Sequence, residues 1–383
     1  MIDDELLSRE QLGTGEWAVT PKPEHLVPDS IARERDRTQF RSQLADEPVG
    51  VIVTHTDADG LGSAALLVDH LQRAFDAARE EIVVQPIDYD GAYRFEHVVE
   101  DLQDAGVIET PIYISDFNLD ELDTLAGLET LAADQGCPIT WFDHHQWSDD
   151  HLDALEDAGV VIEIDDDECA TSLIARELGP FDDRIRELAE CTKDIDLWIR
   201  DDPRSEFLNV YASMVETPWQ YISVVLEHGP DLPDGIQAEI DERLERDREL
   251  EQIAVENRSP TRTIEGYDVV CTYSRGGRSS TIGNELVEEH PSDYDVAIVM
   301  KTHGGIGIYS HSDRTGFVRC HEVAEWLGGG GHPTAAGCSA PVQTFRELAD
   351  YWKTRGASVR EEVIDAVHHV ASSERLAGVS SDE

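Results

Sequence analysis

The chain has 383 residues, enough for two hydrophobic cores, and its formal net charge is −51 because 81 acidic residues face 30 basic ones. Such an acidic excess is typical of disordered chains, but a hydrophobic share of 40% argues against disorder. The composition therefore favours a folded protein from a high-salt cytoplasm over an acidic mesophilic protein, because salt at about 1 M shortens the Debye length to a few ångströms and screens the self-repulsion.

The same charge limits the partners of the protein. An acidic surface repels polyanions, and phosphate contacts weaken as salt rises, which disfavours long, wrapped nucleic acid. The six cysteines form no C-x-x-C pair, so we expect reduced thiols in a cytoplasmic protein. The first residues lack the basic start and apolar run of a signal peptide, and no apolar stretch is long enough to span a membrane.

Apolar runs of strand length follow a polar N-terminal arm at residues 1–47, in which residues 31–45 favour a charged helix. Helical periodicity separates most of these runs, for example at residues 61–79, 120–133 and 170–178. Strands that alternate with helices predict an α/β domain with a parallel sheet, here at residues 48–228. The runs lie at residues 50–54, 82–87, 112–115, 139–142 and 160–164.

A second, smaller α/β domain is predicted at residues 259–375. Helices are expected at residues 182–199 and 205–226, and Gly229-Pro230 then breaks the chain. The charged amphipathic stretch at residues 236–257 predicts a helical linker, within a connecting segment at residues 229–258. The second domain has strand-like runs at residues 267–273, 295–300 and 305–310, a helical stretch at residues 344–371 and a frayed tail at residues 376–383.

Carboxylates and histidines follow several of the predicted strands. His55, Asp57 and Asp59 lie at a strand-to-helix turn, where Gly60 permits a tight backbone path. Carboxylates two residues apart can each face a different metal ion, although a helix cap with acidic residues explains the same string. Asp116 directly follows another strand and suits a bridging carboxylate, since each of its oxygens can bind one ion.

The string Asp143-His144-His145 is more specific. Two histidines at the end of an apolar strand are costly unless they have partners. One imidazole can bind a metal ion, the next can meet a phosphate, and Asp143 can orient a ring. Asp194 and Asp196 follow a helical stretch, and either can complete a second metal site. The carboxyl ends of parallel strands line one crevice, so a two-metal hydrolytic site is expected there.

The glycine run at residues 328–331 precedes His332 and small residues. Such a run ahead of a helix start offers backbone N–H donors to a phosphate or carboxylate. Arg275 and Arg278 flank two glycines and suit a phosphate or base-edge contact, although a loop with solvated arginines is nearly as good an explanation.

Taken together in this order, the strings at residues 48–342 resemble the DHH phosphoesterase superfamily. The resemblance implies a parallel-sheet DHH catalytic domain joined by a helical linker to a smaller α/β substrate-binding domain, whose mark is a Gly-Gly-Gly-His string. Many members carry an Arg-Ser pair before the glycine loop. Here that stretch reads Tyr309-Ser310-His311, so the arginine is missing, and Arg275, Arg278 or Arg314 would substitute for it.

The resemblance also implies roles for individual residues and two Mn²⁺ or Mg²⁺ ions. The catalytic residues would be His145, Asp116 and Asp143, with His145 on the scissile phosphate. One ion would be held by His55, Asp57 and Asp116, and the other by Asp59, Asp116, His144 and Asp194, with Asp196 as the alternative to Asp194. The substrate-binding residues would be Arg275, Arg278, His311, Gly329, Gly330, Gly331 and His332.

The activity that the resemblance implies is metal-dependent hydrolysis of phosphodiesters. The layout is most similar to the hydrolases of short oligoribonucleotides. RecJ-like single-strand exonucleases of DNA repair or replication are a close second, and cyclic-dinucleotide phosphodiesterases are third. A non-catalytic replication factor ranks low, because every expected ligand type is present. The expected partner is short single-stranded RNA or DNA, or a dinucleotide. No association with a membrane is expected. The sequence leaves open whether the protein forms a homodimer.

Overall fold

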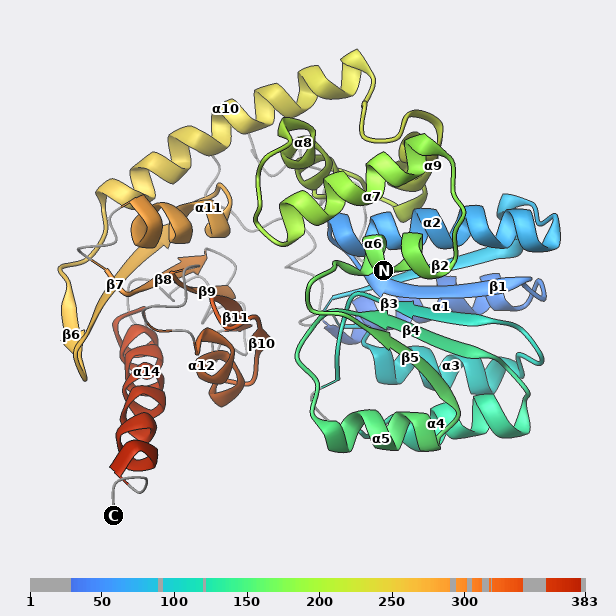
Figure 1. Cartoon of the computed structure of the whole chain (residues 1–383), viewed down its shortest axis with the longest axis horizontal. Helices are drawn as coiled ribbons and strands as arrows, with labels where there is room; N and C mark the ends of the chain where they lie inside the picture. The colour runs from blue at the N-terminus through green and yellow to red at the C-terminus, as the bar shows by residue number, and fades with distance from the viewer. Residues whose placement is uncertain are drawn as a thin grey trace. The chain divides into compact units, whose positions relative to one another are not determined.

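The computed structural model describes residues 29–88, 92–119, 122–289, 294–301, 305–311, 317, 319–339 and 356–379. The chain divides into two compact units, Asp29–Glu242 and the described residues from Arg243 onward. The division falls inside one long helix, α10 (Asp234–Glu256). In Figure 1 the first unit runs from blue to yellow, and the second runs from yellow to red.

The first unit contains a sheet of five parallel strands in the order β2-β1-β3-β4-β5. The strands are β1 (Gly50–His55), β2 (Ile82–Ile87), β3 (Ile112–Ser115), β4 (Ile139–Asp143) and β5 (Val160–Ile164). All five lie where the apolar runs predict them, because strands covered on both faces read as near-continuous hydrophobic runs. The strand order reverses between β1 and β3, and in such sheets the crevice at this point is where ligands bind.

Helices cover both faces of this sheet, with α2 on one side and α3, α4 and α5 on the other (Figure 1). One face and its helices share a core cluster to which Val53, Leu102 and Trp141 belong. On the other face α2 packs on β1 and also contacts α6, α7 and α9. The helices are α1 (Asp29–Leu44), α2 (Ala58–Phe75), η3 (Arg79–Glu81), α3 (Phe95–Ala105), α4 (Leu125–Glu129), η4 (Thr130–Asp134), α5 (Asp149–Asp157), α6 (Ala170–Glu177), α7 (Asp183–Asp196), α8 (Pro203–Ala212) and α9 (Pro218–His228).

Two features of the first unit differ from the predictions. The charged helix predicted within an N-terminal arm is α1, and it packs on the unit through Phe40 and Leu44, which are buried in the core. The helical stretch predicted at residues 205–226 is divided into α8 and α9. Pro218 occupies the first turn of α9 and cannot continue the hydrogen bonding of a preceding helix, which explains the break.

The second unit contains a six-stranded mixed sheet in the order β10-β11-β9-β8-β7-β6, in which only β7 and β8 pair in parallel. The strands are β6 (Arg262–Ile264), β7 (Tyr267–Ser274), β8 (Val296–Lys301), β9 (Gly305–Ser310), β10 (Gly330–Gly331) and β11 (Ala335–Ser339). One core cluster includes residues of α10 and of α11 (Ser279–Asn284) with η5 (Glu285–Glu289). The other includes residues of α12 (Cys320–Trp326) and α14 (Gly356–Val379). The unit is therefore also an α/β fold.

The helix start predicted after the glycine run is wrong. Residues Ala335–Ser339 form β11, which pairs antiparallel with β10 and β9. Parts of some predictions lie outside the described residues. These parts are residues 1–28 of the arm, Arg314, residues 344–355 of the helical stretch and residues 380–383 of the tail. In the part of the chain that the structure describes, no helix has the length and apolar character needed to cross a bilayer.

Candidate metal centre

Acidic and imidazole side chains of the first unit gather where its central strands end. β1 ends at His55, Asp116 directly follows β3, and His144 directly follows β4. Because the three strands are parallel neighbours, their carboxyl ends meet at one edge of the sheet. Asp196, the last residue of α7, joins them there.

A first group of ligand atoms comes from His55, Asp57 and Asp116. His55 Nδ1 lies 3.0 Å from Asp57 Oδ2 and 3.7 Å from Asp116 Oδ2. The ligand atoms of the group all lie within 4.8 Å of one another. An imidazole and two carboxylates at this spacing can hold one divalent cation.

A second group comes from Asp59, His144 and Asp196, again with ligand atoms within 4.8 Å of one another. His144 Nε2 lies 3.7 Å from Asp59 Oδ2 and 3.4 Å from Asp196 Oδ2. It also lies 3.4 Å from Asp116 Oδ1. Asp116 therefore presents one oxygen to each group, as a carboxylate between two cations would.

Asp116 is held in an unusual conformation for this purpose. Its φ is 62°, in the left-handed region that residues with a Cβ seldom adopt, although aspartate tolerates it better than most. Its backbone N–H donates to the carbonyl oxygen of Phe142 at 3.0 Å, which ties the residue to the end of β4. The side chain is almost completely buried. Strained residues of this kind cluster at functional sites.

Two buried carboxylate oxygens accept no hydrogen bond from any described residue. They are Oδ2 of Asp116 and Oδ2 of Asp196. Buried polar atoms in folded proteins nearly always have a partner, so such atoms call for an explanation. A cation would supply the missing partner for both.

Asp57 and Asp59 also stabilise local structure. Asp57 caps α2, because its Oδ1 accepts the N–H groups of Asp59 and Gly60, both at 3.0 Å, while its Oδ2 faces His55. The sequence offers a helix cap and a cation ligand as alternative roles for Asp57. In the structure the two roles are compatible, because each uses a different oxygen of the carboxylate. Asp59 accepts the N–H groups of Ala170 at 2.7 Å and of Thr171 at 2.8 Å, at the start of α6. Both carboxylates are therefore fixed in orientation before any ligand binds.

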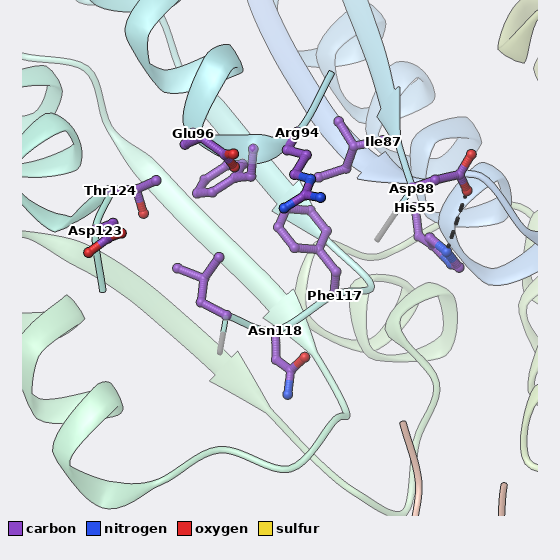
Figure 2. Close-up of a pocket in the computed structure, with 11 residues that line it drawn as sticks. His55, Ile87, Asp88, Arg94, Glu96, Phe117, Asn118, Asp123 and Thr124 are labelled. Atoms are coloured by element: carbon purple, nitrogen blue, oxygen red, sulfur yellow. Dashed lines mark ion pairs between the residues drawn. The ribbon is translucent and has the colours of Figure 1, made fainter. Parts of the chain in front are cut away.

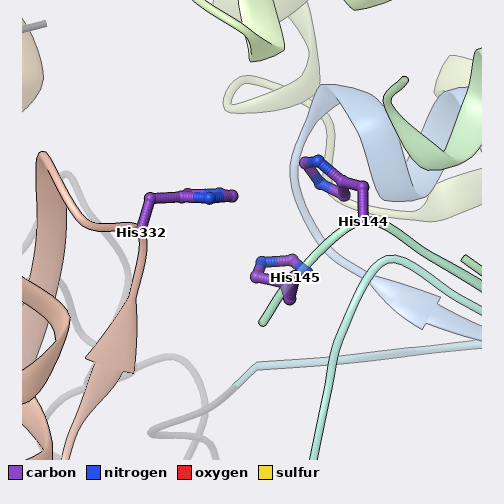
Figure 3. A group of neighbouring side chains, drawn as sticks. All are labelled: His144, His145 and His332. Carbon is purple, nitrogen blue, oxygen red and sulfur yellow. The ribbon is translucent and has the colours of Figure 1, made fainter. Parts of the chain in front are cut away.

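Asp143 orients the second histidine of its string. Its Oδ1 lies 2.7 Å from His145 Nδ1, and its Oδ2 accepts the Nε1–H of Trp147 at 2.6 Å. The pKa of Asp143 lies below its ordinary value although burial opposes this, because the nearby His145 favours the ionised carboxylate. Figure 3 shows His144 and His145 as neighbouring rings at the end of β4, and their centroids lie 4.7 Å apart.

The electrostatics of the cluster favour a cation. Burial and the charges of Asp57 and Asp59 raise the pKa of Asp116 well above its ordinary value. Burial, together with Asp59 and Asp57, raises the pKa of Asp196 to about 8, although the nearby His144 opposes the shift. Carboxylates that repel one another in this way bind a divalent cation with a gain in free energy, because the cation neutralises them.

Of the two aspartates between which the sequence analysis left a choice, Asp196 belongs to the second group of ligand atoms, whereas Asp194 belongs to none of the groups formed by the described residues. The carboxylate of Asp194 accepts the N–H groups of Asp201 at 2.8 Å and Asp202 at 3.2 Å, and the hydroxyl of Ser205 at 2.6 Å. It therefore secures the turn between α7 and α8. Two residues further along α7, the side chain of Asp196 lies on a different face of the helix and meets His144.

The predicted substrate-binding residues all belong to the second unit. Arg275 is exposed in the loop after β7, and His311 directly follows β9. Arg278 is engaged by Glu251, whose Oε1 accepts its backbone N–H at 2.9 Å and its Nε–H at 3.2 Å. Glu251 is itself buried, so this interaction anchors the loop to α10.

The glycine run has a structural reason of its own. A Cβ on Gly329 would lie 2.1 Å from the carbonyl oxygen of Gly337, and Gly331 has a φ of 137°. Gly330 pairs with Gly337 between β10 and β11. His332 starts the turn between these strands, where its N–H donates to Ala335 O at 2.7 Å (Figure 3). Close approach of two strands thus requires glycine at two of the four positions, and substrate binding by this segment stays a prediction.

A cavity that the sequence analysis missed borders the cluster. It has a volume of about 440 Å³, and His55 is one of its lining residues, together with Arg94, Phe117 and Asn118 (Figure 2). Its walls come from the segments after β2 and β3, which are separated in sequence. The sequence offers only a weak signal for it, namely polar residues that follow two adjacent strands.

No family model matches the chain, and no curated protein matches it. Among solved structures, the chain is similar to a protein described as the DHH domain of a member of a ribosomal protein family. The TM-score is 0.56 at 13% identity, over 90% of this chain and 92% of that one. The chain has the fold of a DHH domain. The resemblance seen in the sequence is thereby confirmed for the fold.

Two further solved structures are similar to the chain at lower TM-scores. One is the exonuclease RecJ bound to manganese, with a TM-score of 0.48 and 12% identity over 93% of this chain and 96% of that one. The other is a pGpG-specific phosphodiesterase from Vibrio cholerae, with a TM-score of 0.42 and 16% identity over 82% of this chain and 99% of that one.

Proposed function

We propose that the first unit binds two divalent cations, Mn²⁺ or Mg²⁺, and that the protein is a hydrolase that cleaves phosphodiester bonds of short oligonucleotides. The observation that carries this proposal is the position of Asp116, whose two oxygens face the His55 and His144 groups, at 3.7 Å and 3.4 Å. Oxygen ligands with a few imidazoles suit Mn²⁺ and similar hard cations.

The ligand sets follow from the two groups. His55, Asp57 and Asp116 would hold one cation, and Asp59, Asp116, His144 and Asp196 would hold the other. When bound, a pair of divalent cations activates water and stabilises charge on the attacking and leaving oxygens of a phosphoryl group. The orphaned oxygens of Asp116 and Asp196 fit this donor set.

His145 is the residue that would contact the scissile phosphate. Because Asp143 engages Nδ1 of the ring, Nε2 is the atom on the opposite side of the imidazole that can donate to a phosphate oxygen. Through this contact the buried Asp143 fixes the plane of the His145 ring. Such orienting carboxylates typically contribute about 10–100-fold to affinity or activity.

The charge of the chain supports a short substrate. At −51 the protein repels a long polyanion, and a short oligonucleotide carries few phosphates. The second unit would hold the end of the substrate, through His332, His311 and the neighbouring glycines. A cytoplasmic location in a high-salt cell accords with the acidic composition.

The decisive assay is hydrolysis by the full chain in multimolar KCl with Mn²⁺. The substrates are 5′-labelled oligoribonucleotides of graded length, long single-stranded DNA and a cyclic dinucleotide. We expect activity to rise as the RNA becomes shorter. Processive degradation of the DNA would instead indicate a RecJ-like exonuclease, and no metal-dependent hydrolysis of any substrate would refute the proposal.

Substitution of each candidate aspartate of α7 distinguishes a metal ligand from a residue that only stabilises the fold. Asp196→Asn is expected to reduce the increase in melting temperature that Mn²⁺ causes, with little change in the metal-free protein. Asp194→Asn is expected to destabilise the protein with or without metal by about 1–3 kcal/mol, because buried donors lose a charged acceptor. Thermal unfolding with and without Mn²⁺ measures both effects. The reverse pattern would return the ligand role to Asp194.

Stabilisation by the metal is expected to increase with pH between about 5 and 8. The pKa of Asp196 in the metal-free fold is about 8 and that of Asp116 is also raised, above the ordinary 3.8 in both cases. A group with a raised folded pKa stabilises the fold below its unfolded pKa, and this contribution is lost as pH rises through the folded value. Cations bind the ionised carboxylates, so they restore the lost stability.

The corresponding measurement is the difference in melting temperature with and without Mg²⁺ at each pH, so that groups outside the cluster largely cancel. We expect a larger difference at pH 8 than at pH 5.5. An equal difference at both values would mean that Asp116 and Asp196 are already ionised in the metal-free protein, contrary to the electrostatics of the cluster.

A further inference from the structure

The cavity of about 440 Å³ beside His55 is large enough for a nucleoside, since small-molecule sites generally occupy about 300–1,000 Å³. All of its lining residues belong to the first unit. His55 is also part of the first group of metal ligands, so a ligand in this cavity adjoins the metal centre (Figure 2).

The cavity has an aromatic floor in a fixed position. Phe95 and Phe117 line it, both are buried, and their rings meet edge to face with centroids 5.2 Å apart. The carbonyl oxygen of Phe117 accepts the Nε1–H of Trp141 at 2.9 Å, and Trp141 packs against both rings. A rigid apolar surface of this kind suits the flat face of a base, which is why proteins bind bases on aromatic side chains.

Thr124 provides a second, independent sign of a ligand. It lines the cavity, is 8% exposed, and its Oγ1 has no hydrogen-bond partner among the described residues. Thr124 lies at the N-cap of α4 but makes no side-chain cap there. A buried hydroxyl without a partner is rare, and a ribose or base that fills the cavity would supply one.

The charges of the lining favour a nucleoside over a chain of phosphates. Asp88, Glu96 and Asp123 are the acidic lining residues of the cavity, whereas Arg94 and His55 are its basic ones. Carboxylates repel phosphate groups and accept hydrogen bonds from the amino groups of bases. The apolar floor and polar rim resemble the usual anatomy of a small-molecule site.

We propose that this cavity, the nucleoside pocket, holds the base and ribose of the nucleotide whose phosphate reaches the metal centre. The inference rests on the proposed function and deepens it, because it gives the first unit a means of recognising the nucleoside part of the substrate. The pocket would select nucleotides over inorganic polyphosphates before the second unit contributes any contact.

Binding to the full chain in Mn²⁺, measured by titration calorimetry, tests the pocket directly. The probes are AMP, CMP and inorganic phosphate. Stacking on the floor should make both nucleotides bind about tenfold more tightly than phosphate, or better. Thr124→Val should weaken AMP binding about fivefold through the lost hydrogen bond and leave phosphate binding unchanged. Phe117→Leu should weaken AMP and CMP alike.

Thr130→Val is the matched control, because the hydroxyl of Thr130 already donates to Ala126 O at 2.9 Å. It should leave AMP binding unchanged. The proposal is overturned if the nucleotides bind no more tightly than phosphate. It is also overturned if folded Thr124→Val and Phe117→Leu both bind AMP as the wild type does.

Failure of the pocket and failure of the proposed function give different results. Bis(p-nitrophenyl) phosphate is a phosphodiester without a nucleoside, so its hydrolysis reports on the metal centre alone. If the wild type hydrolyses it and the oligonucleotides, but AMP and phosphate bind equally, only the pocket is refuted. If the wild type hydrolyses neither substrate, the proposed function fails whatever the calorimetry shows.

Discussion

Asp116→Asn is expected to abolish metal-dependent hydrolysis, with a loss on the order of 10³-fold or more. It replaces the carboxylate that faces both groups with an amide that binds divalent cations weakly. The metal-free protein should be as stable as the wild type or more so near neutral pH, because burial and the charges of Asp57 and Asp59 raise the pKa of Asp116. Hydrolysis, Mn²⁺ binding and thermal unfolding are the measurements.

Asparagine is a better choice than alanine at this position. The φ of residue 116 is 62°, and asparagine tolerates the left-handed region nearly as well as aspartate does. Asp153→Asn, at an exposed position of α5, is the matched control and should leave every measurement unchanged. Full activity of a clean Asp116→Asn preparation would contradict the assignment of the site.

Asp101→Asn is expected to lower the free energy of unfolding by roughly 2–4 kcal/mol. Asp101 is completely buried on α3, where it accepts hydrogen bonds from Arg37 at 2.7 Å, Arg41 at 2.8 Å and Tyr93 at 2.7 Å. An amide cannot satisfy these three donors, and two of them carry charge. The arginines are partly exposed, which keeps the loss below that of a fully buried ion pair.

Asp104→Asn is the matched control for this prediction. Asp104 pairs with the same two arginines but is 62% exposed. Such surface pairs contribute at most about 1 kcal/mol to the free energy of unfolding. Urea unfolding of both variants, in low and in multimolar KCl, gives the comparison. Equal losses for the two variants would contradict the prediction, because the buried Asp101 would then contribute no more than the exposed Asp104.

Much of the first unit could be predicted from the sequence. The five strands could be located because each is a short apolar run between turn residues, and the alternating helices made the sheet parallel. The packing of α1 on the first unit could not be predicted from the sequence, because the helix is highly charged. The apolar Phe40 and Leu44, together with the pairing of its arginines with Asp101 of α3, hold it on the first unit.

The second unit was predicted less completely. β6, β10 and α12 are short, and their few residues carry no clear hydrophobic period. The glycine run was interpreted as a binding loop ahead of a helix, whereas β11 follows it and approaches β10 so closely that Gly329 has no space for a side chain. Contacts between strands decide this, and they are not visible in the local sequence.

The sequence by itself determined which residue types reach the candidate site, because a residue that directly follows a strand of a parallel sheet must lie at its carboxyl edge. That rule covers His55, Asp116 and His144. It does not extend to Asp196, since a helix presents neighbouring carboxylates in different directions and only the packing of α7 decides which one meets His144. The nucleoside pocket likewise needed the tertiary structure, because its walls come from separate segments that only the fold brings together.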